Sequence, residues 1–190
     1  MKLEIISKKP EHESKSTPLL FVHGMWHGAW CWEENFLPYF AQKGFISYAL
    51  SLRGHGKSEG RKGLRWTSLN DYVSDVSEAI KEINRTPILI GHSMGGMVIP
   101  KYLEANPKEG AVLMASAPPT GVMAYLMRAA LKFPLSYLKS NLTLSLQPFI
   151  SSMDRCRFLF FSDDLPQEKL QKYFNTLIPY PGYQINRFKL

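Results

Sequence analysis

Cysteine and long apolar runs are both scarce in this chain of 190 residues. Its two cysteines, Cys31 and Cys156, are too few for a disulfide framework, and neither stands in a C-x-x-C pair. Their scarcity predicts a reduced, cytoplasmic protein. The longest apolar stretch, residues 121–150, is interrupted by three charges and two prolines, so no membrane-spanning helix is expected there. Residues 1–7 contain no apolar signal-peptide core, and secretion is not expected.

Acidic side chains are also few: 16 Asp and Glu stand against 23 Lys and Arg, which gives a net charge of +7. Most of this excess lies in residues 111–190, where the basic side chains are spread singly. A tighter basic group is interpreted as a solvated loop: Arg53, Lys57, Arg61, Lys62 and Arg65. Because no nucleic-acid motif accompanies the charge, we expect no nucleic-acid partner.

Three further patterns are absent from the sequence. It has no spaced sets of histidine and cysteine ligands, no P-loop, and no G-x-G-x-x-G turn after a strand. We therefore expect neither a metal nor a cofactor.

Short apolar runs alternate with helical patterns over residues 1–118. Strands are predicted at 3–7, 18–24, 45–52, 87–90 and 111–114, with 111–114 counted among the buried ones. Helices are predicted at 30–43, with the regular part beginning at Pro38, at 67–84 and at 95–105. This alternation indicates an α/β fold in which helices flank a mostly parallel central sheet.

The pattern changes after residue 118, and residues 119–190 are predicted to form a helical cap-like segment and a tail. Residues 163–168 are typical of an acidic helix start, followed by the apolar positions Leu170, Tyr173, Phe174 and Leu177. An apolar stripe could form a lid for acyl chains, although each residue alone is better interpreted as ordinary core: Met123, Leu126, Met127, Leu131 and Phe133. Arg128, Lys132 and Lys139 leave contact with a membrane surface as a further alternative.

The most informative segment is residues 88–98, a buried strand followed by G-x-S-x-G and then a helix. A turn this sharp needs Gly91 and Gly95, because the backbones of the strand and the helix nearly touch around Ser93. It would expose the Ser93 hydroxyl as a nucleophile and leave the Met94 N–H free to bind an oxyanion.

A second oxyanion donor is predicted from the loop after the strand at 18–24, in His23-Gly24-Met25. Met25 supplies this N–H if the loop folds back over Ser93. We interpret His23 as a residue that orders the loop, and His92 as a packing residue, because neighbouring side chains on a tight turn diverge.

Three motifs in order carry a resemblance to a known family. Residues 23–32 resemble an H-G-x-x-x-G-A-W-x-W oxyanion loop, residues 53–58 an R-G-H-G-x-S turn, and residues 91–96 a G-H-S-M-G-G elbow that includes Gly96. The chain is similar to lipase- and esterase-like α/β-hydrolases over about residues 1–120. The resemblance implies a serine hydrolase acting on small-molecule carboxylic esters, from short esters to monoacylglycerol-like lipids.

One expected part of the site is missing. A serine nucleophile needs a base and a carboxylate that orients it, and in this family the acid and then the histidine follow the serine. All five histidines (12, 23, 27, 55 and 92) precede Ser93, and no triad acid or histidine is identified. Core strands that would follow the cap are missing too.

Three explanations stand in order. The chain is a fragment or a frameshifted product, a second polypeptide completes the site, or His23, His27 or His55 acts by an unusual geometry. The alternative function is a catalytically inactive binding or interaction remnant. A sheet without its last strands exposes an apolar edge, which predicts marginal stability or self-association.

Overall fold

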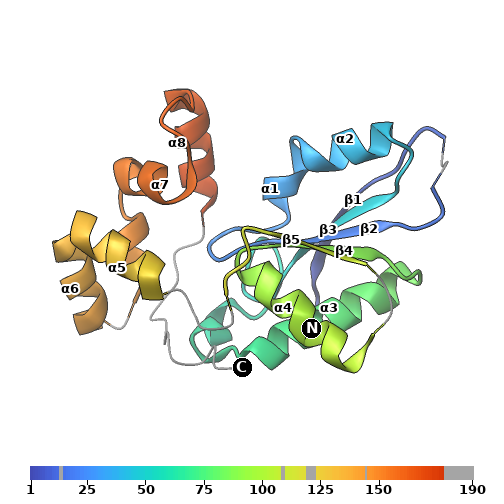
Figure 1. The fold of residues 1–190 in the computed structure, drawn as a ribbon, viewed down its shortest axis with the longest axis horizontal. Helices are drawn as coiled ribbons and strands as arrows, with labels where there is room; N and C mark the ends of the chain where they lie inside the picture. The colour runs from blue at the N-terminus through green and yellow to red at the C-terminus, as the bar shows by residue number, and fades with distance from the viewer. Residues whose placement is uncertain (13–14, 108–109, 119–122, 144, 178–190) are drawn as a thin grey trace.

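The fold is built on one twisted sheet of five strands in the order β1-β3-β2-β4-β5 (Figure 1). The computed structural model describes residues 1–12, 15–107, 110–118, 123–143 and 145–177, and in 123–126 the backbone only. The strands are β1 (Glu4–Lys8), β2 (Leu19–Val22), β3 (Ser47–Ser51), β4 (Ile88–His92) and β5 (Ala111–Met114). Only β1 runs antiparallel, beside β3, and the other pairs are parallel. The predicted mostly parallel α/β sheet is confirmed.

Helices cover both faces of this sheet (Figure 1). On one face lie α1 (Trp30–Glu33) and α2 (Phe36–Gln42), and on the other α3 (Leu69–Ile83) and α4 (Met94–Ala105). Side chains alternate between the faces along each strand. Leu20 and Val22 therefore join the core with α3 and α4, whereas Leu19 and Phe21 pack toward α1 and α2.

Helix α3 begins and ends at residues that suit a helix terminus. The Ser68 hydroxyl accepts a hydrogen bond from Asp71 N–H, and the Asp71 carboxylate accepts one from Ser68 N–H, which forms a capping box. Its last turn closes on Asn84 in the left-handed conformation. The predicted helix at 67–84 is confirmed to within two residues at its start.

Two predicted helix starts are wrong by a few residues. Helix α2 begins before Pro38, because the N–H groups of a first helical turn have no intrahelical acceptor and a proline there loses nothing. Asp163 and Asp164 lie in a turn, and α8 (Gln167–Thr176) begins only after Pro166. Proline disfavours a helical conformation in the residue before it, which delays the helix.

The interpretation of the basic group as a solvated loop is wrong for Arg53. Its guanidinium pairs with Asp71 at 2.8 Å and with Asp75 at 2.7 Å, and its backbone N–H also donates to Asp75. Asp75 is fully buried on α3, so this pair ties the turn after β3 to that helix. Lys57, Arg61 and Lys62 are exposed, as expected of a loop.

A short 3-10 helix, η1 (Arg61–Trp66), lies between β3 and α3. The helices after β5 form a helical segment beside the sheet (Figure 1). They are α5 (Met123–Lys132), α6 (Pro134–Thr143), η2 (Gln147–Ile150), α7 (Met153–Phe160) and α8. Trp26 and Leu64 of the core pack with buried residues of this segment: Ala129, Leu146, Phe149, Ile150, Cys156 and Leu177. The helical character of the second part is confirmed, and its division from the core at residue 118 stays a prediction.

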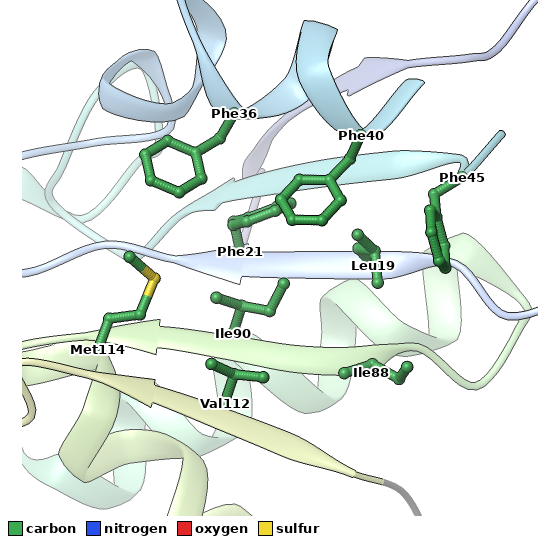
Figure 2. Close-up of a pocket in the computed structure, with 9 residues that line it drawn as sticks. All are labelled: Leu19, Phe21, Phe36, Phe40, Phe45, Ile88, Ile90, Val112 and Met114. Carbon is green, nitrogen blue, oxygen red and sulfur yellow. The ribbon is translucent and has the colours of Figure 1, made fainter. Parts of the chain in front are cut away.

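The sheet ends in an apolar edge at β5. Within the part of the chain that the structure describes, this strand pairs only with β4, and Val112 and Leu113 are each about half exposed, so its prediction as a buried strand is wrong. On the adjoining sheet face, a groove of about 230 Å³ opens beside α2 (Figure 2). Its lining is apolar throughout: Leu19, Phe21, Phe36, Phe40, Phe45, Ile88, Ile90, Val112 and Met114. Self-association through this edge stays a prediction.

Among the described residues, no helix has the length and apolar character needed to cross a bilayer.

Candidate active site

Ser93 occupies the sharp turn between β4 and α4, in a backbone conformation with φ 52° and ψ −112°. A positive φ is costly for a residue other than glycine, so contacts with neighbouring residues must hold this backbone conformation. The Ser93 N–H donates to Met114 O at 3.1 Å, and Ser93 O accepts from Ala117 N–H at 3.1 Å. The turn is thus fastened to the end of β5, and the Ser93 side chain stays partly exposed.

The glycines around Ser93 are required by close backbone packing. A Cβ on Gly95 would lie 2.4 Å from Val22 O, and one on Gly91 would lie 2.6 Å from Gly95 O. A Cβ on Gly96 would lie 2.6 Å from Ser116 Oγ. Since real Cβ atoms essentially never come within 3.0 Å of such neighbours, a side chain at any of these positions would force the packed segments of the elbow to shift.

The loop after β2 folds back over the elbow. A Cβ on Gly24 would stand 3.0 Å from Ser93 Cβ, which places the Gly24 backbone against the serine. The loop turns at Trp26, whose φ is 65°, and closes with His27 N–H donating to Gly24 O at 3.4 Å. Neither Met25 N–H nor Met94 N–H has a hydrogen-bond acceptor among the described residues. Met94 N–H is also at the start of α4, where the helix dipole favours negative charge.

His23 is fully buried behind this loop, and both of its ring nitrogens are engaged with backbone. Nδ1 donates to Gly24 O at 2.7 Å, and Nε2 accepts from Leu52 N–H at 3.1 Å. This pattern fits only the neutral ring. Burial, with the neighbouring His55, holds the pKa of His23 well below its usual range. The contacts support a role for His23 in ordering the loop.

The other histidines around the elbow also have contacts of their own. His27 Nδ1 donates to Met25 O, and its ring stacks on Trp30. His55 Nδ1 donates to Arg53 O, and its ring lies against those of His23 and Tyr72. Burial lowers the pKa of both His27 and His55 to about 4. His92 packs edge-on against Trp32, and burial lowers its pKa too.

Ser93 therefore lacks a partner for proton transfer in the part of the chain that the structure describes. No side chain there forms a hydrogen bond with Ser93 Oγ, and the exposed His12 precedes β2. Within the same residues no group of three or more metal-ligating side chains occurs. The Gly24 backbone lies against Ser93, and Met94 follows it at the start of α4, whereas the roles predicted for Ser93, Met25 and Met94 stay predictions. The rings of His23, His27 and His55 each bond to backbone groups.

Glu4 is a positioning residue that the sequence patterns missed. Its Oε2 accepts a hydrogen bond from Ser51 Oγ at 2.6 Å and from Lys57 N–H at 2.9 Å. Ser51 Oγ in turn accepts from Ala29 N–H at 2.8 Å. Glu4 thus joins the loop before α1 to the turn after β3. No signal in the sequence marks it, because its partners lie far along the chain.

The sequence pattern that defines the alpha/beta hydrolase family matches residues 19–186, and the chain belongs to this family. It is 34% identical to a monoacylglycerol lipase of Mycolicibacterium smegmatis over 84 residues, covering 42% of this chain and 30% of that protein. It is 30% identical to the probable esterase PIR7A of Oryza sativa subsp. indica over 104 residues, covering 53% and 39%. The matched segments thus span less than half the length of these relatives.

Solved structures share the fold across more of the chain. The monoacylglycerol lipase of Paleococcus ferrophilus superposes with a TM-score of 0.64 at 20% identity, covering 100% of this chain and 68% of that one. An esterase from Exiguobacterium antarcticum gives a TM-score of 0.66 at 20% identity, covering 92% and 63%. At this identity the likeness establishes the α/β-hydrolase fold.

Proposed function

We propose that this chain provides the nucleophile and the oxyanion hole of a carboxylic ester hydrolase. One observation carries the proposal: Ser93 is held at a positive φ between β4 and α4, with the loop of Gly24 and Met25 folded against it. A strained backbone persists only where the surrounding structure holds it, and such strain is typical of functional sites. The names of the relatives, a monoacylglycerol lipase and a probable esterase, support the same reaction class.

The proposed reaction follows from these positions. Ser93 Oγ attacks the carbonyl carbon of the ester, and the Met25 and Met94 N–H groups donate hydrogen bonds to the oxygen as it gains negative charge. The alcohol leaves with a proton, the acyl group stays on Ser93, and water then releases the acid. Each step needs a group that moves a proton, and within the described residues no histidine or carboxylate bonds to Ser93 Oγ.

The same observation favours a second candidate, a binding or interaction protein that has kept the elbow without catalysis. A serine without its base retains only the catalysis that an oxyanion hole and binding supply, about 10³- to 10⁴-fold over water. The two candidates differ in whether Ser93 responds to a base when one is provided.

Added imidazole provides that base and separates the two candidates. We expect slow hydrolysis of p-nitrophenyl butyrate by the 190-residue chain, accelerated by imidazole beyond the acceleration seen with the Ser93→Ala variant. The variant corrects for direct attack by imidazole on the ester. If imidazole accelerates the two proteins equally, the elbow is not catalytic and the binding candidate stands.

A further inference from the structure

Helix α6 is folded with its apolar side outward. Ser136 and Ser140 are buried against the protein, whereas Leu135 is 79% exposed and Leu142 77% exposed, with Leu138 also exposed between them. The Ser140 hydroxyl is buried without a hydrogen-bond partner among the described residues. The three leucines stand at i, i+3 and i+7, which places them on one face. A soluble helix buries such a face, so this one is expected to have a partner.

Helix α5, which packs against α6, also carries exposed apolar side chains. Met127 is about half exposed and Leu131 is 82% exposed. The interpretation of these two residues as ordinary core is therefore wrong. A single residue, Phe133, joins α5 to α6, and the two helices lie together at the end of the helical segment farthest from the sheet (Figure 1). We call the combined surface the leucine face: Met127, Leu131, Leu135, Leu138 and Leu142.

The charges on α5 and α6 are all basic, whereas the exposed Asp154 on α7 is acidic. Arg128, Lys132 and Lys139 are exposed on the same two helices. The Arg128 guanidinium and the Lys132 ammonium lie 5.8 Å and 6.0 Å from the centre of the Phe158 ring, which adds an exposed aromatic edge. Residues 110–153 contain no Asp or Glu. The partner is therefore expected to be apolar and negatively charged.

We propose that the leucine face docks on an anionic lipid surface. Helices that bear leucines on one side with Lys and Arg beside them lie in the lipid interface, where apolar burial and attraction to anionic headgroups act together. A protein partner would need its own acidic and apolar groove, whereas a bilayer offers both features along its whole surface. The idea that docking supplies lipid-like esters to Ser93 rests on the proposed function. The docking itself is independent of that function.

Vesicle flotation tests the docking with the full chain carrying Ser93→Ala, so that hydrolysis plays no part. We expect binding to phosphatidylcholine vesicles that contain phosphatidylserine, and much weaker binding to phosphatidylcholine alone. Replacing Leu135, Leu138 and Leu142 by glutamine should lower the partition coefficient more than tenfold, because three apolar side chains lose their burial. Replacing Lys132 and Lys139 by glutamate should lower binding to the anionic vesicles about 20-fold or more, at about fivefold for each basic charge lost.

A control is Tyr39→Gln on α2, which removes another exposed large side chain, 53% exposed against 57% for Leu138, away from the leucine face and should leave binding unchanged. Thermal melts of all variants check that they remain folded. The proposal is overturned if the chain with an unaltered leucine face does not bind the anionic vesicles at low salt. It is also overturned if the leucine substitutions leave that binding intact. A wild-type dimer in the ultracentrifuge that becomes a monomer on the leucine substitutions also overturns it, because the face then covers a second copy.

Discussion

The folded chain should lose much of its stability as the pH falls from 7 to 5. His55 is buried and His27 is half-buried beneath the loop, and the loss of hydration lowers the pKa of each from 6.5 to about 4. Below pH 6.5 the unfolded chain takes up protons that the folded chain excludes, so unfolding becomes more favourable as the pH falls. By pH 5 each histidine should lower the free energy of unfolding by about 2 kcal/mol. His23, whose pKa burial also lowers, acts in the same direction.

Urea unfolding followed by tryptophan fluorescence at pH 7, 6 and 5 measures this effect. The combined loss of at least about 4 kcal/mol is large beside the 5–15 kcal/mol that holds a typical domain together. Replacing His27 by glutamine should flatten the profile by about one histidine's share. A free energy of unfolding that stays constant from pH 7 to 5 would show that these rings are not held neutral.

Gly95→Ala should be the most damaging single methyl addition in the elbow. The new Cβ would lie 2.4 Å from Val22 O and 2.8 Å from His23 O, both of them backbone atoms that cannot turn aside. Overpacking of this kind costs about 3 kcal/mol or more, which corresponds to a fall in Tm of roughly 6–12 °C for a domain of this size. The strand and the helix must separate, so Ser93 also loses its position.

Gly63→Ala and Gly110→Ala are the matched controls, because a Cβ at either position meets no atom within 4 Å. Both variants should melt within a few degrees of the wild-type chain, since replacing a glycine without strain changes stability by less than about 1 kcal/mol. If Gly95→Ala melts as they do, β4 and α4 do not pack as closely as the structure places them.

The order of strands and helices could be predicted because each signal is local. The apolar runs of β2 and β4 and the spacing of Leu69, Tyr72 and Val76 on α3 depend only on near neighbours in the chain. The elbow was predictable for the same reason, since Gly91, Ser93 and Gly95 are adjacent in sequence.

Features that depend on contacts between residues far apart in the chain could not be predicted from the sequence. Arg53 resembles any loop arginine until α3 brings Asp75 to it, and Glu4 gains its role only from Ser51 and Lys57. The prediction that β5 is buried was wrong, because an apolar run does not reveal whether a further strand lies beside it. The outward leucines of α6 likewise follow from which side of the helix meets the protein.

We propose that Ser93 of this chain is a nucleophile without a histidine base of its own. The rate at which a fluorophosphonate forms an adduct, mapped by mass spectrometry and followed across pH, tests that claim most directly. We predict an adduct on Ser93 that is absent from Ser93→Ala, formed slowly and about tenfold faster per pH unit from about pH 7 to 9, because hydroxide must take the proton. A fast rate that is already constant above pH 7, or an adduct on another residue, would contradict the account.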